Sequence, residues 1–274
     1  MTNRVWLITG TSSGFGRAIA ERALAAGDTV VATARHTDAL AELSAMAPDR
    51  VTPMRLDVTD TNAIANVVQD AITWHGRIDV LVNNAGHAYV GAVEETPDAE
   101  LRYMLEVHLH GPISLTKAVL PHMRARRSGA VVQISSMAGQ VSWAGMSAYC
   151  TAKFALEGHS EALAAEVAPL GIKVLIVEPG AFRTDVARDL RQAPEIPDYA
   201  ATTAEARASA RTIHGTQPGD PAKAAEAILA ALEADRTPLR LPLGADAHEA
   251  ITAKLRDTLA EAESWRATAA ATDL

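Results

Sequence analysis

The chain has 274 residues, of which 48% are hydrophobic, and its 33 acidic against 25 basic side chains give a net charge of −8. This charge opposes binding to nucleic acid or to an anionic membrane surface, and no apolar run approaches the roughly 20 residues that a membrane-spanning helix needs. The one cysteine, Cys150, has no partner for an internal disulfide and the N-terminal residues show no export signal, so we expect a cytoplasmic protein.

Short β-branched runs alternate with Ala- and Leu-rich helical patterns from the N-terminus onward. Several of the runs are apolar without alternation, as strands buried on both faces are. This order predicts the α/β class: a doubly wound parallel β-sheet, or Rossmann fold, with helices on both faces. Gly111 and Pro112 are expected to bend or break the third helix. The predicted strands are 5–8, 29–33, 51–56, 78–82, 130–134 and 172–177, and the predicted helices are 14–26, 62–75, 97–127, 148–167 and 220–234.

The second half of the chain is less regular. Between about 183 and 219 the sequence has few apolar anchors and several prolines, which predicts an insertion of short helices that forms a mobile lid over the substrate. An apolar run follows at 239–243, and a helical pattern resumes after Gly244 as a C-terminal extension at about 245–268. We therefore expect a single domain over residues 1–274.

Three glycines, Gly10, Gly14 and Gly16, separate the first predicted strand from the first helix. At this position of a doubly wound sheet, the first glycine permits a turn, the second lets backbone N–H groups approach a pyrophosphate, and the third lets helix and strand pack closely. The spacing differs from the generic G-x-G-x-x-G, and an ordinary strand–helix turn is the alternative. The candidate dinucleotide loop comprises Gly10, Thr11, Ser12, Ser13, Gly14, Phe15 and Gly16.

Arg35 follows the second predicted strand, about 20 residues after the glycine loop, where NAD-binding proteins carry an acidic residue for the ribose. A cation there favours the 2′-phosphate of NADP, so the sequence predicts NADP(H) in preference to NAD(H). The alternative is a surface arginine that binds no ligand. No metal site is predicted.

Tyr149 and Lys153 lie four residues apart on a predicted helix and share one of its faces, and Ser136 ends the strand that precedes this helix. A free tyrosine titrates near pH 10, and a neighbouring ammonium favours its phenolate, so we expect Lys153 to lower the pKa of Tyr149. Tyr149 then serves as general acid and base for a carbonyl or alcohol oxygen that Ser136 also hydrogen-bonds. For Y-x-x-x-K alone, an ordinary helix-surface pair is the alternative.

Five motifs in this order and spacing resemble those of the short-chain dehydrogenase/reductase family, over residues 5 to about 243. TGTSSGFG at 9–16 resembles TGxxxGxG, NNAG at 83–86 resembles the segment that supports the cofactor, and PGAFRT at 179–184 resembles PGxxxT, which holds the nicotinamide. The resemblance implies hydride transfer between nicotinamide and a ketone, aldehyde or secondary alcohol. The further cofactor-binding residues that it implies are Asp57, Val58, Asn84, Ala85, Gly86, Tyr149, Lys153, Pro179, Gly180, Phe182 and Thr184.

The sequence departs from the family at one catalytic position, where His108 replaces the usual active-site Asn. That Asn acts largely through its backbone carbonyl, which His108 retains. One hypothesis is that His108 joins or tunes the proton relay, because a histidine titrates near neutrality. The alternative is a tolerated replacement at a helix kink.

The segment that follows Ser136 is expected to line the substrate pocket with mainly apolar side chains. This composition predicts a moderately hydrophobic ketone, aldehyde or secondary alcohol, although the same side chains could belong to the core. The candidate substrate residues are His87, Gln140, Val141, Trp143 and Met146.

The family resemblance also implies a homodimer or homotetramer, paired through the helices at 97–127 and 148–168. The alternative is that the apolar stripes of these helices are core. Two other functions remain open. An NADP(H)-binding sensor with little turnover is disfavoured by the intact Ser136, Tyr149 and Lys153, and an epimerase or dehydratase is disfavoured by the modest length.

Overall fold

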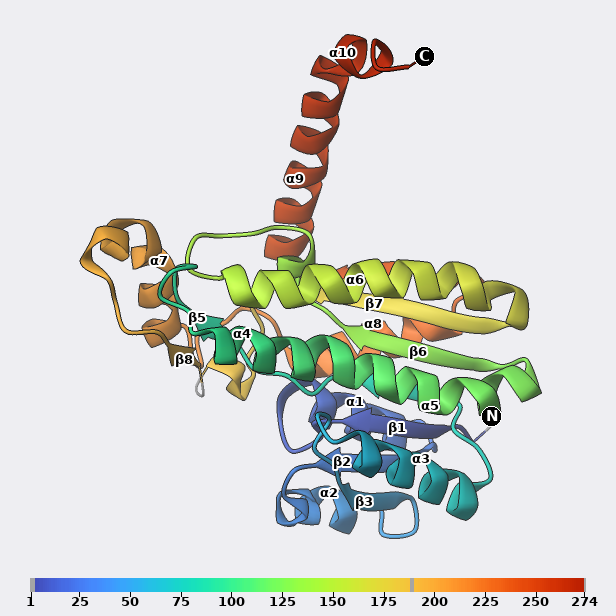
Figure 1. The fold of residues 1–274 in the computed structure, drawn as a ribbon. Coiled ribbons are helices and arrows are strands. Elements are labelled where there is room, and N and C mark those ends of the chain that lie inside the picture. Colours follow the sequence, from blue (N-terminus) through green and yellow to red (C-terminus); the bar gives the residue numbers. More distant parts are fainter. Residues whose placement is uncertain (1–2, 188–189, 274) are drawn as a thin grey trace.

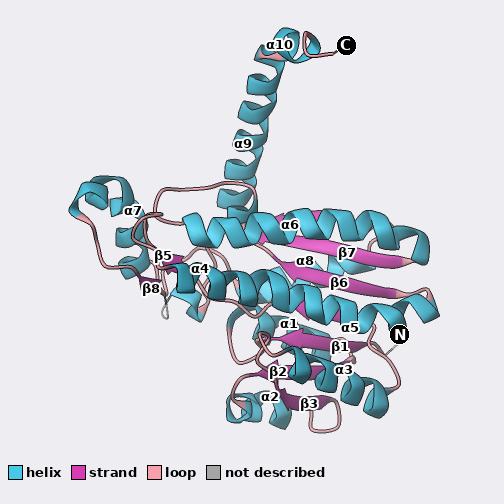
Figure 2. Ribbon diagram, in the orientation of Figure 1, coloured by secondary structure: helices cyan, strands magenta, loops and turns pink. Residues whose placement is uncertain are grey.

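The computed structural model describes residues 3–187 and 190–273 as a parallel β-sheet between two layers of helices (Figures 1 and 2). The seven strands follow the order β3-β2-β1-β4-β6-β7-β9, and every neighbouring pair is parallel. The predicted doubly wound α/β fold is therefore confirmed, and the apolar run at 239–243 contains its seventh strand. The strands are β1 Val5–Thr9, β2 Thr29–Ala34, β3 Val51–Arg55, β4 Val80–Asn83, β6 Gly129–Ile134, β7 Ile172–Pro179 and β9 Arg240–Leu243.

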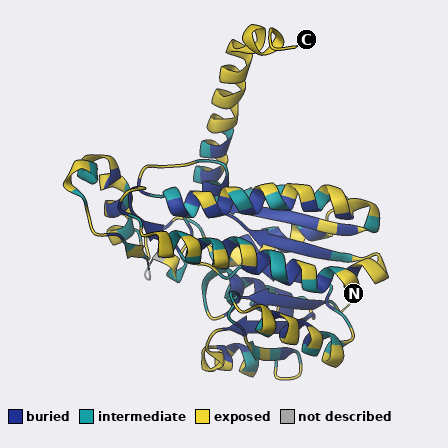
Figure 3. Ribbon diagram, in the orientation of Figure 1, coloured by how far each residue is buried: buried dark blue, intermediate teal, exposed yellow. Residues whose placement is uncertain are grey.

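Both faces of the sheet are covered, which explains why β1 and β2 are buried along their whole length (Figure 3). Successive side chains of a strand point to opposite faces. Trp6 and Ile8 therefore belong to the core beneath α1 and α8, whereas Leu7 belongs to the core beneath α3, α5 and α6. The helices are α1 Gly14–Ala25, α2 Ala41–Met46, α3 Thr61–His75, α4 Asp98–Leu105, α5 Gly111–Arg126, α6 Ser147–Val167, α7 Ala200–Thr212, α8 Pro221–Glu233, α9 Ala245–Ser264 and α10 Arg266–Ala270.

The chain changes direction across the sheet between β1 and β4. From β1 it continues to β2 and β3 on one side, and from β4 it continues to β6, β7 and β9 on the other. The loops that leave the carboxyl ends of β1 and β4 consequently diverge and leave a crevice, which is where open α/β sheets bind ligands.

The long third helix is interrupted, as expected, near Gly111 and Pro112. Between α4 and α5 the backbone forms a π-helical turn, Glu106–His110, immediately before these two residues. Such single-turn π segments occur frequently at functional sites. Here the turn contains His108, the candidate catalytic residue.

The predicted lid segment contains more regular structure than the sequence indicated. The short strand β8 Arg191–Gln192 pairs in parallel with β5 Tyr89–Val90, and α7 is a full helix of 13 residues. Arg207 of α7 lies 2.6 Å from the buried carboxylate of Glu95, and this ion pair joins the segment to the body. A buried ion pair therefore anchors this segment, in which the sequence has few apolar anchors.

Candidate active site

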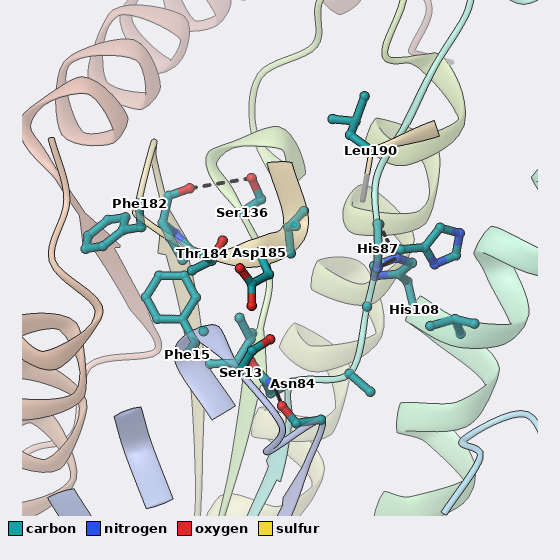
Figure 4. Close-up of a pocket in the computed structure, with 18 of the residues that line it drawn as sticks. Ser13, Phe15, Asn84, His87, His108, Ser136, Phe182, Thr184, Asp185 and Leu190 are labelled. Atoms are coloured by element: carbon teal, nitrogen blue, oxygen red, sulfur yellow. Dashed lines mark hydrogen bonds between the residues drawn. The ribbon is translucent and has the colours of Figure 1, made fainter. Parts of the chain in front are cut away.

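A cavity of about 720 Å³ opens at the carboxyl ends of the central strands (Figure 4). Gly10 follows β1, Asn84 follows β4, and Ser136 lies just beyond β6, so three strands contribute to one wall. The cavity brings together most of the residues that the sequence singled out. Those are Gly10, Ser12, Ser13, Gly14, Phe15, Arg35, Asp57, Val58, Asn84, Ala85, Gly86, His87, His108, Ser136, Tyr149, Lys153, Pro179, Gly180, Phe182 and Thr184.

The glycine loop adopts a backbone conformation in which residues with a side chain would be strained. Gly10 and Gly14 have φ of +69° and +56°, in the left-handed region that favours glycine. A Cβ on Gly16 would lie 2.3 Å from the carbonyl oxygen of Gly10, so this position holds the loop tightly against α1. Asn84 donates from its side chain to the carbonyl oxygens of Thr9 (2.8 Å) and Gly10 (3.1 Å), which ties the loop to β4.

The N-terminus of α1 faces the cavity with its backbone N–H groups. Among the described residues, no side-chain cap satisfies these groups, and the first turn of α1 contains no acidic residue. Such a helix end binds anionic groups, phosphates above all. The volume of the cavity, the left-handed glycines and this helix end together fit a dinucleotide with its pyrophosphate over Ser13 and Gly14.

Two members of the predicted loop support it from behind and do not line the cavity. Thr11 is buried and donates its hydroxyl to the carbonyl oxygen of Thr33 (3.1 Å), which fixes the loop to the end of β2. Gly16 packs beneath the loop, as described above. Both residues support the loop, and their contact with a cofactor stays a prediction.

Arg35 lies exposed at the end of β2, on the rim of the cavity near Asp57. Burial raises the pKa of Asp57, but hydrogen bonds from Thr59 and the charges of Arg35 and Arg55 outweigh this effect and lower it. The rim therefore presents an ionised carboxylate that Thr59 holds in place (2.8 and 3.0 Å) beside an exposed guanidinium.

Ser136, Tyr149 and Lys153 meet on the opposite side of the cavity from this rim. Tyr149 and Lys153 lie on successive turns of α6, and the Lys153 ammonium nitrogen is 5.6 Å from the centroid of the Tyr149 ring. The Lys153 ammonium donates to the carbonyl oxygen of Ile134 (2.8 Å), and Tyr149 shares a hydrogen bond with Ser136. Three polar groups of suitable chemistry thus converge.

The predicted lowering of the Tyr149 pKa by Lys153 is wrong. Burial raises the pKa of Tyr149 to about 12, and the hydrogen bond with Ser136 offsets this only in part. Burial also lowers the pKa of Lys153 to about 7, against the opposing charge of Glu157. Desolvation therefore dominates over the ammonium–phenol attraction: the phenol keeps its proton, while the lysine exchanges its proton near neutral pH.

His108 lies buried between Tyr149 and the chain after β4. Its ring is edge-on to that of Tyr149, with centroids 5.6 Å apart, and its Nε2 lies 2.8 Å from the carbonyl oxygen of His87. Gly86 makes room for this ring, because a Cβ there would lie 2.5 Å from its Cε1. Burial first, and then the charge of Lys153, lower the pKa of His108 well below 6.5, so the imidazole is neutral.

We therefore expect the pH–rate profiles of the wild-type protein and of His108→Asn to share the same midpoints between about pH 6 and 9, since a neutral imidazole does not titrate there. The measurement is kcat against pH for both proteins with one substrate. A limb near pH 6.5 that disappears in His108→Asn would instead place the histidine within the titrating relay.

A buried charged cluster lies one turn beyond Lys153, on the same face of α6. Glu157 accepts a hydrogen bond from the Ser135 hydroxyl (2.6 Å) and lies 3.0 Å from the Arg240 guanidinium, which also reaches Glu178 (2.9 Å). Burial and the nearby charge of Glu157 raise the pKa of Glu178 to about 8, in spite of Arg240. Glu178 is therefore largely protonated at neutral pH.

This cluster predicts a pH-dependent stability. The folded state holds the Glu178 proton more tightly than the unfolded state, whose carboxyl titrates near 4.5, so the resulting stabilisation is complete below about pH 4.5 and is lost as pH rises toward 8. We expect Glu178→Gln, which has no proton to lose, to show a smaller fall in Tm between pH 5 and 8 than the wild type. Glu161→Gln, which removes the exposed partner of Arg240, is the control; parallel falls in all three proteins would contradict the assignment.

Four of the predicted substrate residues lie outside the cavity. Gln140 is drawn away by a hydrogen bond to Glu157, and the Val141 carbonyl accepts from the Cys150 thiol. Trp143 is 39% exposed, and Met146 bridges to Gly91 beside β5. Of the five candidates only His87 lines the cavity, and a substrate contact of the other four stays a prediction.

No sequence motif predicts the other cavity residues near His87. Its Nε2 lies 3.3 Å from Glu100 of α4, and Glu100 also binds Arg191 of β8 (2.7 Å), a cavity residue from the segment after β7. Tyr103 stacks at 5.1 Å on His87, and Leu190 and Ile213 complete an apolar wall. None of these positions belongs to a sequence motif, and only the fold brings them together.

A model of the short chain dehydrogenase family matches residues 4–195. The chain belongs to this family. The oxidoreductase BOA17 of Botryotinia fuckeliana is 41% identical over 96% of this chain and 97% of that protein. A short-chain dehydrogenase from Streptomyces avermitilis superposes with a TM-score of 0.94 at 53% identity over 99% of both chains. A Burkholderia cenocepacia short chain dehydrogenase in complex with NADP superposes at 0.76, with 25% identity over 96% of this chain and 97% of that one.

Membership makes this chain an oxidoreductase of a family that binds a nicotinamide cofactor and acts on small molecules. No helix in the described ranges combines the length and apolarity that a membrane crossing requires.

Proposed function

We propose that this short-chain dehydrogenase reduces a moderately hydrophobic ketone or aldehyde with NADPH, or oxidises the corresponding secondary alcohol with NADP, and that Tyr149 is its general acid and base. The observation that carries the proposal is the convergence of Ser136, Tyr149 and Lys153 in the same cavity as the glycine loop. A positioned proton donor beside a dinucleotide cradle is what carbonyl reduction needs.

The glycine loop and the cavity residues around it support the cofactor half of the proposal. The N-terminus of α1 would receive the pyrophosphate, and Arg35 would receive a 2′-phosphate, with Asp57 and Val58 beside the adenosine. Phe182 and Thr184 lie against the glycine loop, since the Phe182 and Phe15 rings are 5.1 Å apart (Figure 4). When bound, the dinucleotide supplies or accepts the hydride. The NADP complex of the Burkholderia relative is consistent with the NADP(H) preference.

Ser136, Tyr149 and Lys153 support the part of the proposal that concerns proton transfer. Tyr149, with a pKa of about 12, keeps the proton that a reduced carbonyl oxygen requires, and Ser136 can donate to the same oxygen as its charge develops. Lys153, with a pKa of about 7, is suited to return that proton from solvent at neutral pH. Reversal of these steps removes the proton from an alcohol.

The remaining wall of the cavity supports the substrate class. Tyr103, Leu190 and Ile213 present apolar surface, while His87 and Arg191 add polar contacts. We also propose that the segment at 183–219 acts as a lid over this wall, that the protein is cytoplasmic, and that it forms a homodimer or homotetramer.

The test is the oxidation of NADPH by the purified protein with a panel of aldehydes, ketones and diketones, followed by nicotinamide absorbance. Turnover of at least one apolar carbonyl supports the proposal. Tight NADPH binding with no turnover across the panel would favour the alternative, an NADP(H)-binding sensor.

A further inference from the structure

The C-terminal helix α9 leaves the body of the protein and projects away from it, with α10 at its tip (Figure 1). Its first turns are anchored, because Ala247 and Ile251 are buried in the body. From Ala253 to Asp273 every residue is exposed (Figure 3). We call residues 253–264, the outer part of α9, the arm.

The arm continues the apolar stripe that anchors the helix. Ile251, Leu255 and Leu259 follow one another at intervals of four and so share one face. Leu255 and Leu259 are nevertheless 57% and 63% exposed. Helices of this length are marginal in water without tertiary contacts, and their stability comes from the packing of such a face. The stripe therefore has the features of a contact surface whose partner is another molecule.

The charges beside the stripe indicate what that partner is. Lys254 and Glu261 lie on one flank of Leu255, seven residues or two turns apart. On the opposite flank, Arg256 and Glu263 repeat the same order and the same spacing. Each flank is thus basic toward the body and acidic toward the tip, and Glu263 already accepts from Arg266 of its own chain (2.6 Å).

This charge pattern is complementary to that of a second arm that runs in the opposite direction. A second arm in antiparallel orientation places its Glu261 beside Lys254 and its Glu263 beside Arg256, with the same pairs repeated in the other direction. The midpoints of the two pairings fall at 257.5 and 259.5, about 3 Å apart along the helix. One two-fold axis between Thr258 and Leu259 therefore leaves each pair about two residues from direct opposition, which these long side chains span, and brings the two leucine stripes together. Such an interface, in which one patch meets its own copy, is the usual form of a homodimer contact.

We propose that the arm pairs with the arm of a second copy of this chain, antiparallel, around a two-fold axis near Thr258. The leucine stripe supplies the burial, and the flanking charges fix the orientation and register, as flanking charges do in coiled coils. The proposal is independent of the activity and of any contact between the bodies of two chains. If such contacts form an oligomer, pairing of the arms doubles the number of chains in it.

The first test compares masses by sedimentation or light scattering. Leu255→Ser with Leu259→Ser should halve the mass of the wild-type assembly, whereas Ala253→Ser with Ala260→Ser, on the opposite face of the same helix, should leave it unchanged. Tm measurements establish that both double variants are folded. Equal masses for the wild type and the leucine variant would overturn the proposal.

The second test addresses the pairing itself at low ionic strength, where screening is weak. A Lys254→Glu, Arg256→Glu chain carries only acidic flanks, and a Glu261→Lys, Glu263→Lys chain carries only basic flanks. Each alone should show half the wild-type mass, and an equimolar mixture should regain the full mass as a mixed assembly. Failure of the mixture to regain it, while the leucine variant has halved, would show that the arms meet something other than each other.

Discussion

Replacement of Tyr149 by Phe is expected to lower kcat for carbonyl reduction about a thousandfold, while NADPH binds within about twofold of the wild-type affinity. The change removes one oxygen from a partly buried side chain and leaves its ring against His108. That oxygen holds the proton, since the pKa of Tyr149 is about 12, and Ser136 is its hydrogen-bond partner. The measurement is kcat and the dissociation constant of NADPH for both proteins.

Tyr103→Phe is the matched control, because Tyr103 also lines the cavity and loses the same atom. It should retain turnover within about a factor of ten. If Tyr149→Phe kept wild-type kcat, or if both variants lost activity equally, Tyr149 would not be the acid and base.

Replacement of Arg35 by Asp is expected to weaken NADPH binding by about 100-fold and NADH binding by less than about threefold. The guanidinium is exposed on the cavity rim, and only NADPH carries a 2′-phosphate for it to pair with. An aspartate there would also repel that phosphate beside the ionised Asp57. The measurement is a titration of each nucleotide into each protein.

Arg55→Asp is the control for this prediction. Arg55 is an exposed arginine that also lowers the pKa of Asp57, yet it does not line the cavity. It should change both affinities little. Equal losses of NADPH and NADH affinity in Arg35→Asp would contradict the role of Arg35 in cofactor selection.

The sheet was predictable because its signals are local and redundant. Strands such as β1 and β2 are buried on both faces and read as short apolar runs, and the glycine at the end of α3 is the left-handed Gly76 that a helix end favours. By contrast, β5 and β8 have two residues each, too few for any periodicity. The anchoring pair of Glu95 and Arg207 joins residues more than 100 positions apart, which no local pattern predicts.

In the candidate site, too, some features follow from local sequence patterns and others depend on the fold. Residues of the glycine loop and of the Ser136, Tyr149 and Lys153 trio sit at fixed offsets from strand ends, so the sequence located them. The position of Gln140 after β6 predicts a pocket residue, whereas its hydrogen bond to the buried Glu157 holds the side chain outside the cavity. The pKa of Tyr149 depends on burial, which a sequence does not contain, and the predicted lowering of this pKa was for that reason wrong.

The most direct measurement of the central claim follows the hydride itself. The protein is incubated with a carbonyl compound that it turns over and with NADPH that carries deuterium at both C4 positions of the dihydronicotinamide, and the product alcohol is analysed by mass spectrometry. Transfer from the nicotinamide predicts one deuterium in every product molecule, bound to the former carbonyl carbon, and about a thousandfold less of this product in the same time with Tyr149→Phe. An alcohol without deuterium, or equal labelled product from Tyr149→Phe, would contradict it.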